Sequence, residues 1–172
     1  MKQRFRTLAA VLLLSAVGAA HAAPSCRNDI RSTAPDSRFA DNGNGTVSDA
    51  ATGLVWKQCA EGLSGAGCLT GGVSGLTWQQ ALQGAADATF AGQTDWRLPN
   101  KNELESLVER RCYGPAINVR FFPNTPSNVF WSSSPGANYY SDYAWVVDFY
   151  YGNVVYHYRY YALYVRLVRG GQ

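Results

Sequence analysis

Few side chains in this sequence have the types and spacing that catalysis requires. Beyond the N-terminal 22 residues there is a single histidine, His157, so a nucleophile–histidine–carboxylate set would have to be built around it. The carboxylates of Glu103, Glu105 and Glu109 fall within one expected helix and are typical of a solvated face rather than of paired catalytic acids. We therefore expect no enzyme activity, no metal and no cofactor.

The cysteines are better suited to disulfides than to nucleophilic or metal chemistry. They are Cys26, Cys59, Cys68 and Cys112. Four cysteines allow three pairings, and we favour Cys59–Cys68, which closes a short glycine-rich loop, with Cys26–Cys112, which ties an N-terminal arm to the rest of the chain. Zinc is the less favoured alternative, because the sequence offers neither close Cys-x-x-Cys pairs nor histidine partners. Two free thiols would reopen the possibility of an enzyme.

Tyrosine is concentrated near the C-terminus. Ten of the eleven tyrosines lie between Tyr139 and Tyr164. So many tyrosines in one segment cannot all be buried with their hydroxyls satisfied. A surface rich in tyrosine, mixed with asparagine, serine, aspartate and histidine, resembles a paratope, because tyrosine supplies contact area and a polar tip at little entropic cost. The alternative is a sheet that packs only on itself or forms an oligomer interface.

Alternation along this segment separates two sets of side chains, because successive residues of a strand point to opposite faces. One set is large and apolar, which predicts that it faces the core: Trp145, Val147 and Phe149. The other is chemically mixed, which predicts that it faces outward: Val146, Asp148 and Tyr150. We expect a ligand-binding surface made of Asn138, Tyr139, Tyr140, Ser141, Asp142, Tyr143, Val146, Asp148, Tyr150, Tyr151, Asn153, Val155, Tyr156, His157, Tyr158, Tyr160 and Tyr161.

A small hairpin is expected near the N-terminus of the domain that carries this segment. A turn over 41–45, a strand over 46–49, a turn at 52–53 and a strand over 54–57 predict it. A plain turn over 41–45 is favoured over a calcium loop, because glycines stand at two of the positions where oxygen ligands would alternate.

Two helices are expected in the middle of the chain. Thr77 with Gln80 fits a capping box at the start of the first. Asn100 with Glu103 fits the start of the second, which we expect to end near 112–114. Apolar residues at helical spacing predict the buried faces, namely Trp78, Ala81, Leu82 and Ala85 in the first helix and Leu104, Leu107 and Val108 in the second.

Strands are expected beyond Pro115. The segments with strand character are 129–133, 143–151, 153–158 and 164–168. Two helices followed by a mainly antiparallel sheet predict the α+β fold class.

The N-terminus predicts export. Lys2, Arg4 and Arg6 precede an apolar run over 8–17, and a small-x-small triplet at 20–22 follows, as in a secretory signal peptide. The sequence has 15 Lys and Arg against 12 Asp and Glu, so without the three bases of the signal the balance is 15 − 3 = 12 against 12. A net charge near zero gives no electrostatic reason to expect nucleic acid or an anionic membrane as partner.

We expect three parts in the chain: a signal peptide over 1–22, an N-terminal arm over 23–37 and a ligand-binding domain over 38–172. No later segment is apolar over enough residues to cross a bilayer, so no integral membrane segment is expected in the mature chain. The expected protein is periplasmic, cell-surface or secreted. Its expected partner is a protein or a cell-surface glycan.

Several segments together resemble the C-terminal domain of the collagen-like adhesin (Lcl-type) family of Legionella-type bacteria. They occur in order from about Arg38 to the end of the chain, at 41–47, 52–56, 95–100, 103–104, 130–133 and 164–166. The resemblance implies a C-type-lectin-like fold, related to that of the formylglycine-generating enzyme. One departure is Leu167, where many relatives carry a cysteine between two arginines.

A narrower resemblance involves the C-terminal segment, which is similar to the variable proteins of diversity-generating retroelements. The residues that carry it are Ala144, Trp145, Val147, Phe149, Gly152, Val154, Arg159 and 164–172. In those systems an error-prone reverse transcriptase mutates the adenines of a template and writes the copy into the 3′ end of the gene. The positions between these residues, with Ala162 and Leu163 among them, hold no Lys, Glu, Gln, Met or Trp, which mutated asparagine codons cannot encode.

Two functions fit these features. One is a diversified ligand-binding protein, in which a rigid frame carries changeable contacts. Its frame would consist of Trp131, Trp145, Val147, Phe149 and Val165. The other is a fixed adhesin for polysaccharide or glycosaminoglycan, as the wider family implies. A sulfated polymer would need a basic patch, for which Arg159, Arg166 and Arg169 are the only candidates nearby, and the resemblance implies that Arg166 and Arg169 are structural.

Overall fold

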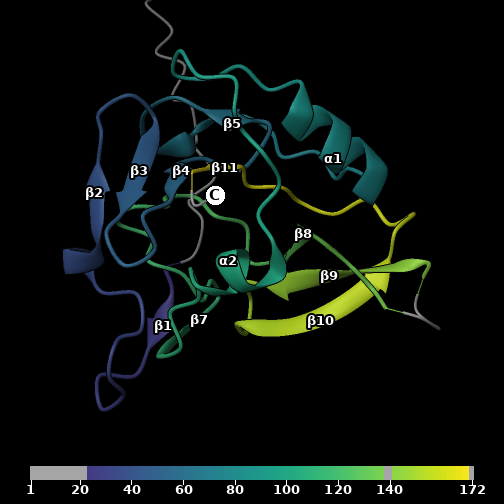
Figure 1. Cartoon of the computed structure of the whole chain (residues 1–172). Coiled ribbons are helices and arrows are strands. Elements are labelled where there is room, and N and C mark those ends of the chain that lie inside the picture. The colour runs from purple at the N-terminus through teal and green to yellow at the C-terminus, as the bar shows by residue number, and fades with distance from the viewer. Residues whose placement is uncertain (1–22, 138–140, 171–172) are drawn as a thin grey trace, which may run out of the picture.

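The computed structural model describes residues 23–137 and 141–170 (Figure 1). The signal peptide expected over 1–22 and the expected site residues 138–140 lie outside the described residues. The described residues include two α-helices, α1 (Trp78–Ala86) and α2 (Lys101–Glu105). Short 3₁₀ turns occur at Asp36–Arg38 and Ala66–Cys68.

Antiparallel strand pairs form the rest of the regular structure. The larger sheet has the order β11 (Val168–Arg169), β4 (Val55–Lys57), β3 (Thr46–Asp49) and β2 (Phe39–Asp41). The second sheet has the order β10 (Asn153–Tyr158), β9 (Tyr143–Asp148) and β8 (Val129–Pro135). Two short pairs are β1 (Ser25–Cys26) with β7 (Cys112–Tyr113) and β5 (Leu63–Ser64) with β6 (Thr70–Gly71). The expected α+β class is confirmed.

Both expected disulfides are present. Cys26 and Cys112 face each other across the β1–β7 pair, so this bond ties the N-terminal arm to the body of the domain. The arm contains the short strand β1. Cys59–Cys68 closes the glycine-rich loop, as expected. The expected hairpin is also confirmed, because β3 and β4 pair directly.

Both helices begin where they are expected to begin, but the second helix ends earlier than expected. Thr77 and Asn100 each form a complete capping box. The second helix ends at Glu105, well before the expected 112–114, because its last turn tightens. The Val108 amide donates to the Glu105 carbonyl, three residues back, and Val108 then forms an isolated β-bridge with Ile117.

The extended segment expected over 164–168 forms a ladder only at its end, where β11 pairs with β4. Before that, the chain makes single bridges, from Leu163 to Leu76 and from Tyr164 to Phe130. The strand expected over 143–151 is also shorter, since β9 ends at Asp148 and a hairpin loop leads into β10. The C-terminal stretch thereby links both sheets.

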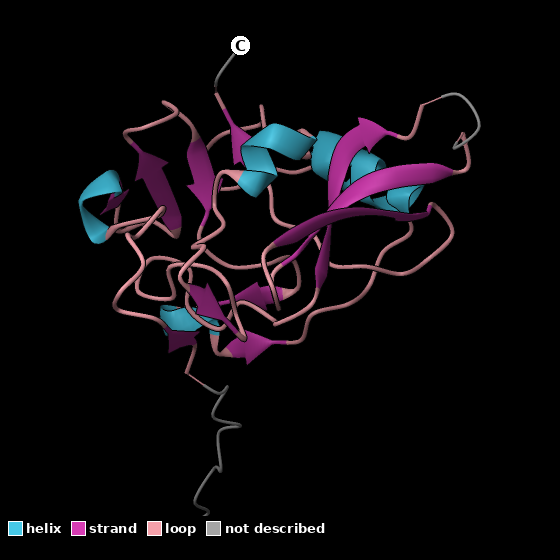
Figure 2. Ribbon diagram, turned by 90° about the horizontal axis from the view of Figure 1, so that it is seen from below, coloured by secondary structure: helices cyan, strands magenta, loops and turns pink. Residues whose placement is uncertain are grey.

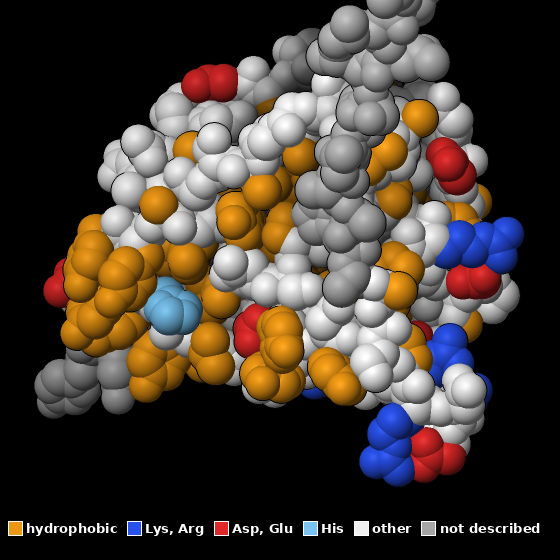
Figure 3. Space-filling view, turned by 180° about the vertical axis from the view of Figure 1, so that it is seen from behind, with side chains coloured by type: hydrophobic (Ala, Val, Ile, Leu, Met, Phe, Trp, Pro, Cys, Tyr) orange, Lys and Arg blue, Asp and Glu red, His pale blue; other side chains and the backbone are white. Residues whose placement is uncertain are grey.

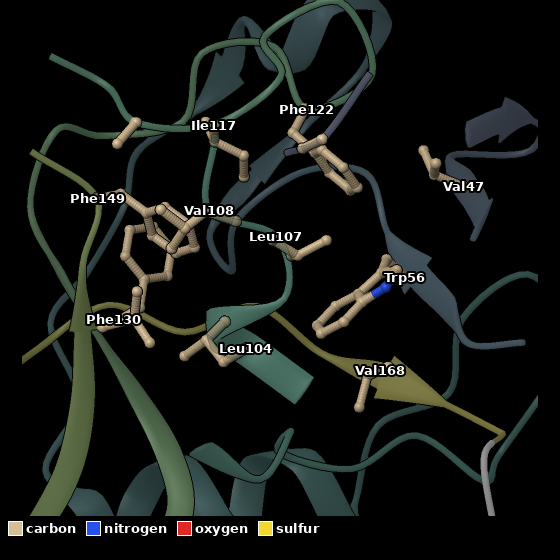
Figure 4. Packing of buried hydrophobic residues seen from close by; sticks show 14 of the residues in the cluster. Val47, Trp56, Leu104, Leu107, Val108, Ile117, Phe122, Phe130, Phe149 and Val168 are labelled. Carbon is tan, nitrogen blue, oxygen red and sulfur yellow. The ribbon is translucent and has the colours of Figure 1, made fainter. Parts of the chain in front are cut away.

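The core consists of two apolar clusters, one on each side of the second sheet. The first contains Trp56, Leu104, Leu107, Phe130 and Phe149 (Figure 4), which come from both sheets, from α2 and from the segments just after α2 and β9. The second contains Ala81, Ala85, Trp96, Leu98, Trp131 and Val146, and it packs α1 against the sheet (Figure 2). The buried faces expected for both helices belong to these clusters.

The outward orientation expected for Val146 is wrong. Its relative exposure is 0%, and it packs in the second cluster beside Trp131. Val147 and Phe149 are buried, as expected, but Trp145 on the same strand is only half-buried. The reason is that β9 is the central strand of its sheet and α1 covers the face opposite the first cluster. Alternation distinguishes two faces but does not show whether the second one is covered.

Candidate functional site

Large side chains of the C-terminal hairpin are exposed together. Among the described residues, ten large apolar or aromatic side chains are exposed, and seven of these belong to residues 150–161. Their relative exposures run from 37% at Tyr158 to 66% at Tyr160. We call this the tyrosine surface: Tyr150, Tyr151, Val155, Tyr156, Tyr158, Tyr160 and Tyr161. Figure 3 shows such side chains gathered around a histidine, and His157 is the only histidine that the structure describes.

One aromatic cluster lies where the β9–β10 hairpin is open, and we call it the strand-end cluster. Antiparallel pairing sets Tyr158 opposite Tyr143 and Tyr156 opposite Trp145, so these four rings share one face of the sheet. The ring centroids of Tyr143 and Tyr158 lie 4.0 Å apart, and those of Trp145 and Tyr156 lie 5.6 Å apart in an edge-to-face arrangement. Tyr160 stacks on Tyr158 at 5.2 Å. These contacts hold the rings in a defined arrangement.

A second cluster lies at the hairpin loop, and we call it the loop cluster. Tyr150 and Tyr151 are adjacent rings with centroids 4.4 Å apart, and Tyr113 of β7 lies 6.5 Å from Tyr150. Tyr113 is exposed, although the sequence did not place it in the site. No periodicity marks this isolated tyrosine. Backbone hydrogen bonds bring it here, since the amides of Gly114 and Ala116 donate to the carbonyls of Tyr150 and Phe149.

Gly152 shapes the loop that carries the second cluster. Its φ is +77°, a conformation that side chains disfavour. A Cβ atom at this position would lie 2.6 Å from Cγ1 of Val108 in the core. The loop therefore approaches the core too closely for any other residue, which explains why glycine stands between Tyr151 and Asn153.

Two hydroxyls in and beside the tyrosine surface, those of Tyr143 and Tyr160, stay protonated. The pKa of Tyr143 is raised to about 12, mainly by its hydrogen bond with Tyr158 and to a smaller extent by partial loss of solvent. The pKa of Tyr160 is raised mainly by loss of solvent and to a smaller extent by the neighbouring Tyr161. At physiological pH these groups are neutral and can both donate and accept hydrogen bonds. The surface suits polar, uncharged partners.

The smaller expected site residues differ in their surroundings. Ser141, Asp142 and Asn153 are exposed. Asp148 is half-buried, and its carboxylate accepts the Tyr150 amide at 2.8 Å, so it orders the loop. His157 is half-buried, with its ring 5.5 Å from that of Tyr161. Among the described members of the expected site, Val146 is buried and Asp148 orders the loop, whereas the others lie on the β9–β10 hairpin and the segments next to it.

The three C-terminal arginines do not form a basic patch. The Arg159 guanidinium lies 4.2 Å above the Trp78 ring, and its Nε donates to the Tyr143 carbonyl. Arg169 pairs with Asp95 at 2.8 Å. Arg166 is completely buried, and burial lowers its pKa to about 9.

Arg166 is a structural residue. It donates to the carbonyls of Lys57 and Gln58 and to the Thr125 hydroxyl, so it joins β4 to the segment before β8. Arg169 joins β11 to Asp95. The structural role implied for these two arginines is therefore confirmed.

The carboxylates considered for catalysis hold the fold together. Glu103 pairs with Arg97 at 2.8 Å, and Glu105 pairs with Arg110 at 2.6 Å. The solvated position expected for Glu109 is wrong, since its relative exposure is 2%. Among the described residues no group of three or more His, Cys, Asp or Glu could hold a metal ion, and no cysteine is free.

Glu109 anchors the N-terminal arm. Its carboxylate accepts the amides of Thr33 and Ala34, both at 3.1 Å, and the hydroxyl of Ser32. Burial by itself raises the pKa of Glu109, but the hydrogen bonds outweigh it and the net pKa is lowered. The carboxylate is buried because the arm folds over it, which no local pattern indicates.

A hollow of about 650 Å³ lies away from the tyrosine surface, between the turn at 41–45 and the Cys59–Cys68 loop. Lys57 and Phe90 line it, and the Lys57 ammonium lies 4.7 Å above the Phe90 ring. No helix in the described part of the chain has the length and apolar character needed to span a bilayer.

Comparison with known proteins supports one assignment. A search of curated proteins found no match. The family model described as the Lcl C-terminal domain matches residues 45–169, which include both sheets' central strands, both helices and the whole tyrosine surface. The chain therefore belongs to the Lcl C-terminal domain family.

Proposed function

We propose that this chain is an exported ligand-binding protein whose tyrosine surface is diversified, as in the variable proteins of retroelements, on a C-type-lectin-like fold. Membership of the Lcl family supports an adhesin-like or ligand-binding domain. Two disulfides fit the oxidising compartments outside the cytoplasm. The proposal includes no catalytic activity.

One observation carries this proposal: frame positions and changeable positions have different surroundings. Trp131, Val147 and Phe149 of the frame have 0% exposure. The changeable positions 150–151, 153, 155–158 and 160–161 include all seven members of the tyrosine surface. A rigid scaffold with exposed, variable side chains is the general arrangement of a tunable receptor.

Val146 limits what diversification can do. It occupies a changeable position by pattern, yet it is buried beside Trp131. Functional sibling proteins should therefore keep small apolar residues there, whereas exposed positions such as Tyr156 should vary freely. The residues found at position 146 would then reflect selection for folding, and those found at exposed positions would reflect selection for binding.

A fixed adhesin for polysaccharide is the second candidate. Exposed tyrosine rings such as Tyr151 and Tyr160 offer platforms on which sugar rings can stack. The engaged Arg159, Arg166 and Arg169 argue against sulfated polymers, which require free basic groups. An uncharged glycan is the form of this alternative that the surface accommodates.

The test is to sequence the 3′ end of the gene in many cells of one strain, together with the flanking DNA. We expect differences confined to the changeable positions, opposite adenines of a near-copy beside a reverse-transcriptase gene. A uniform segment without a near-copy would contradict diversification and favour the fixed adhesin. A glycan-binding screen would then be the next measurement.

A further inference from the structure

The outer edge of β10 is a feature of the tyrosine surface that belongs to the backbone. β10 is the outermost strand in the order β10-β9-β8, and among the described strands it pairs with β9 alone. In Figure 1 it runs along the lower boundary of the domain. An edge strand presents N–H and C=O groups that can pair with another chain.

The hydrogen bonds around β9 establish which residues of β10 face this edge. The Arg159 amide donates to the Asp142 carbonyl at 2.9 Å, just beyond the end of the ladder. Bonded and non-bonded pairs alternate along an antiparallel ladder. The pattern therefore assigns the bonds with β9 to Asn153, Val155 and His157. The backbone groups of Val154, Tyr156 and Tyr158 are directed away from β9, and the Tyr158 carbonyl already accepts the Tyr161 amide.

The other sheet edges are protected against pairing. β2 is three residues long and ends in the charged Asp41. β11 is two residues long, and its Val168 is bridged by Arg97. β8 ends in Pro135 and has a register shift between Trp131 and Pro135. Short length, charge, proline and irregular register are devices that prevent strand addition.

β10 has none of these devices. It spans six residues, its register with β9 is unbroken, and it contains neither a charged residue nor a proline. The nearest charged residues are Asp148, which lies on β9 opposite Asn153, and Arg159, which follows the end of β10, so neither charge interrupts the edge. The one long, regular and uncharged edge thus coincides with the surface proposed for binding.

We infer that β10 binds its ligand by strand addition, and that the ligand contributes an extended, uncharged segment of polypeptide. This inference rests on the proposed function and specifies a protein ligand rather than a glycan. Main-chain hydrogen bonds supply affinity that does not depend on side chains, while alternate side chains supply specificity. Such binding tolerates diversification, because changes at Tyr156 or Tyr158 leave the backbone in place.

The side chains around the edge indicate the chemistry of the segment. Val154, Tyr156 and Tyr158 lie on one face of the sheet, and Val155 and His157 lie on the other. An added strand would extend both faces and cover apolar area that is now exposed at Val155 and Tyr158. Apolar or aromatic residues at alternate positions suit this environment, and a charged residue there would lose solvent without a partner.

A second copy of the chain is a weaker candidate for this edge. Six residues at about 3.3 Å each and one strand spacing of about 4.8 Å define a strip on the order of 100 Å². A stable interface needs about 500 Å² on each partner, so two folded domains meeting only along this strip would not hold. A narrow peptide, in contrast, can insert its side chains beside the flanking tyrosines on both faces.

The test uses a displayed library of random ten-residue linear peptides, panned on the full-length protein. We expect enriched sequences to be uncharged and to alternate apolar residues. Val154→Pro removes an outward N–H without removing a bond to β9, and it should weaken binding of the most enriched peptide at least tenfold. Val154→Ala keeps that N–H and should change the affinity less than threefold. Urea unfolding of both variants checks that they are folded.

A second measurement needs no protein variant. N-methylation of alternate peptide amides should abolish binding in one register and leave it unchanged in the other, because only one set of amides faces β10. Equal binding by Val154→Pro, equal effects in both registers, or no enrichment of any peptide would overturn the inference. A dimer in sedimentation that Val154→Pro dissociates would also overturn it, by placing a second copy on the edge.

Failure of the inference is distinguishable from failure of the proposed function. If Tyr151→Ala and Tyr160→Ala abolish binding of the enriched peptide while Val154→Pro does not, binding depends on side chains alone, and strand addition is wrong. The diversified surface would still stand in that case. Gene sequencing decides the proposed function separately.

Discussion

Val146 offers the sharpest test of how the tyrosine surface is built, through the substitution Val146→Asp. Val146 has 0% exposure and lies among apolar side chains such as Trp131 and Leu98. Val155 is its direct partner across β9 and β10, on the same face of the sheet, and is 40% exposed. Val155→Asp is therefore a matched control, since it places the same carboxylate on the same face one strand farther out.

The expected loss of stability in Val146→Asp follows from the burial of this position. Loss of two buried methyl groups removes about 1.6 kcal/mol, at roughly 0.8 kcal/mol for each. A buried carboxylate without a partner adds about 3–5 kcal/mol. The sum of about 5–7 kcal/mol is comparable with the whole stability of many domains, about 5–15 kcal/mol. Val155→Asp should lower stability by at most about 1 kcal/mol, the span of strand propensities.

Urea unfolding at pH 7 with both disulfides intact measures the difference. Val146→Asp should unfold at much lower urea than the control. Burial would raise the pKa of the new carboxyl above its unfolded value, so its destabilising effect should grow as pH rises through the unfolded pKa and shrink at pH 4. Equal unfolding midpoints for the two variants at pH 7 would refute the reasoning, because Val146 would then face solvent.

Three further predictions concern the glycine of the hairpin loop and two anchors of the N-terminal arm. Gly152→Ala should lower the free energy of unfolding by about 1–3 kcal/mol, because alanine disfavours the positive φ and its Cβ would clash with Val108. Gly84→Ala in α1 is the control, because nothing lies within 4 Å of its Cβ position, and it should be neutral or stabilising in the same denaturant assay. Glu109 has a lowered pKa, so its stabilisation is present above the unfolded pKa and is lost as pH falls through the folded pKa; Glu109→Gln should flatten this acid branch in unfolding curves measured from pH 7 to pH 3. Reduction of Cys26–Cys112 should lower stability by about 2–5 kcal/mol and expose the arm to protease, and an arm equally protected after reduction would contradict the role of this bond.

Local features of the fold were predictable because local interactions produce them. The capping boxes at Thr77 and Asn100 depend on residues three positions apart, and both form. The hairpin of β3 and β4 depends on a short turn, and it also forms. The end of the second helix was not predictable, because Val108 leaves the helix to bridge Ile117, a residue from a later segment.

The candidate site likewise has some features that the sequence predicts and others that only the tertiary structure shows. The sequence by itself determined that the surface is rich in tyrosine and which residues alternate along β10, since composition and period are properties of the chain. It favoured one of three cysteine pairings, and the structure shows that pairing. Only the tertiary structure decided that α1 covers Val146, that β7 brings Tyr113 beside Tyr150, and that the arm buries Glu109. Each of these depends on which distant segment packs against a face, and strand alternation is the same whether that face meets water or another element.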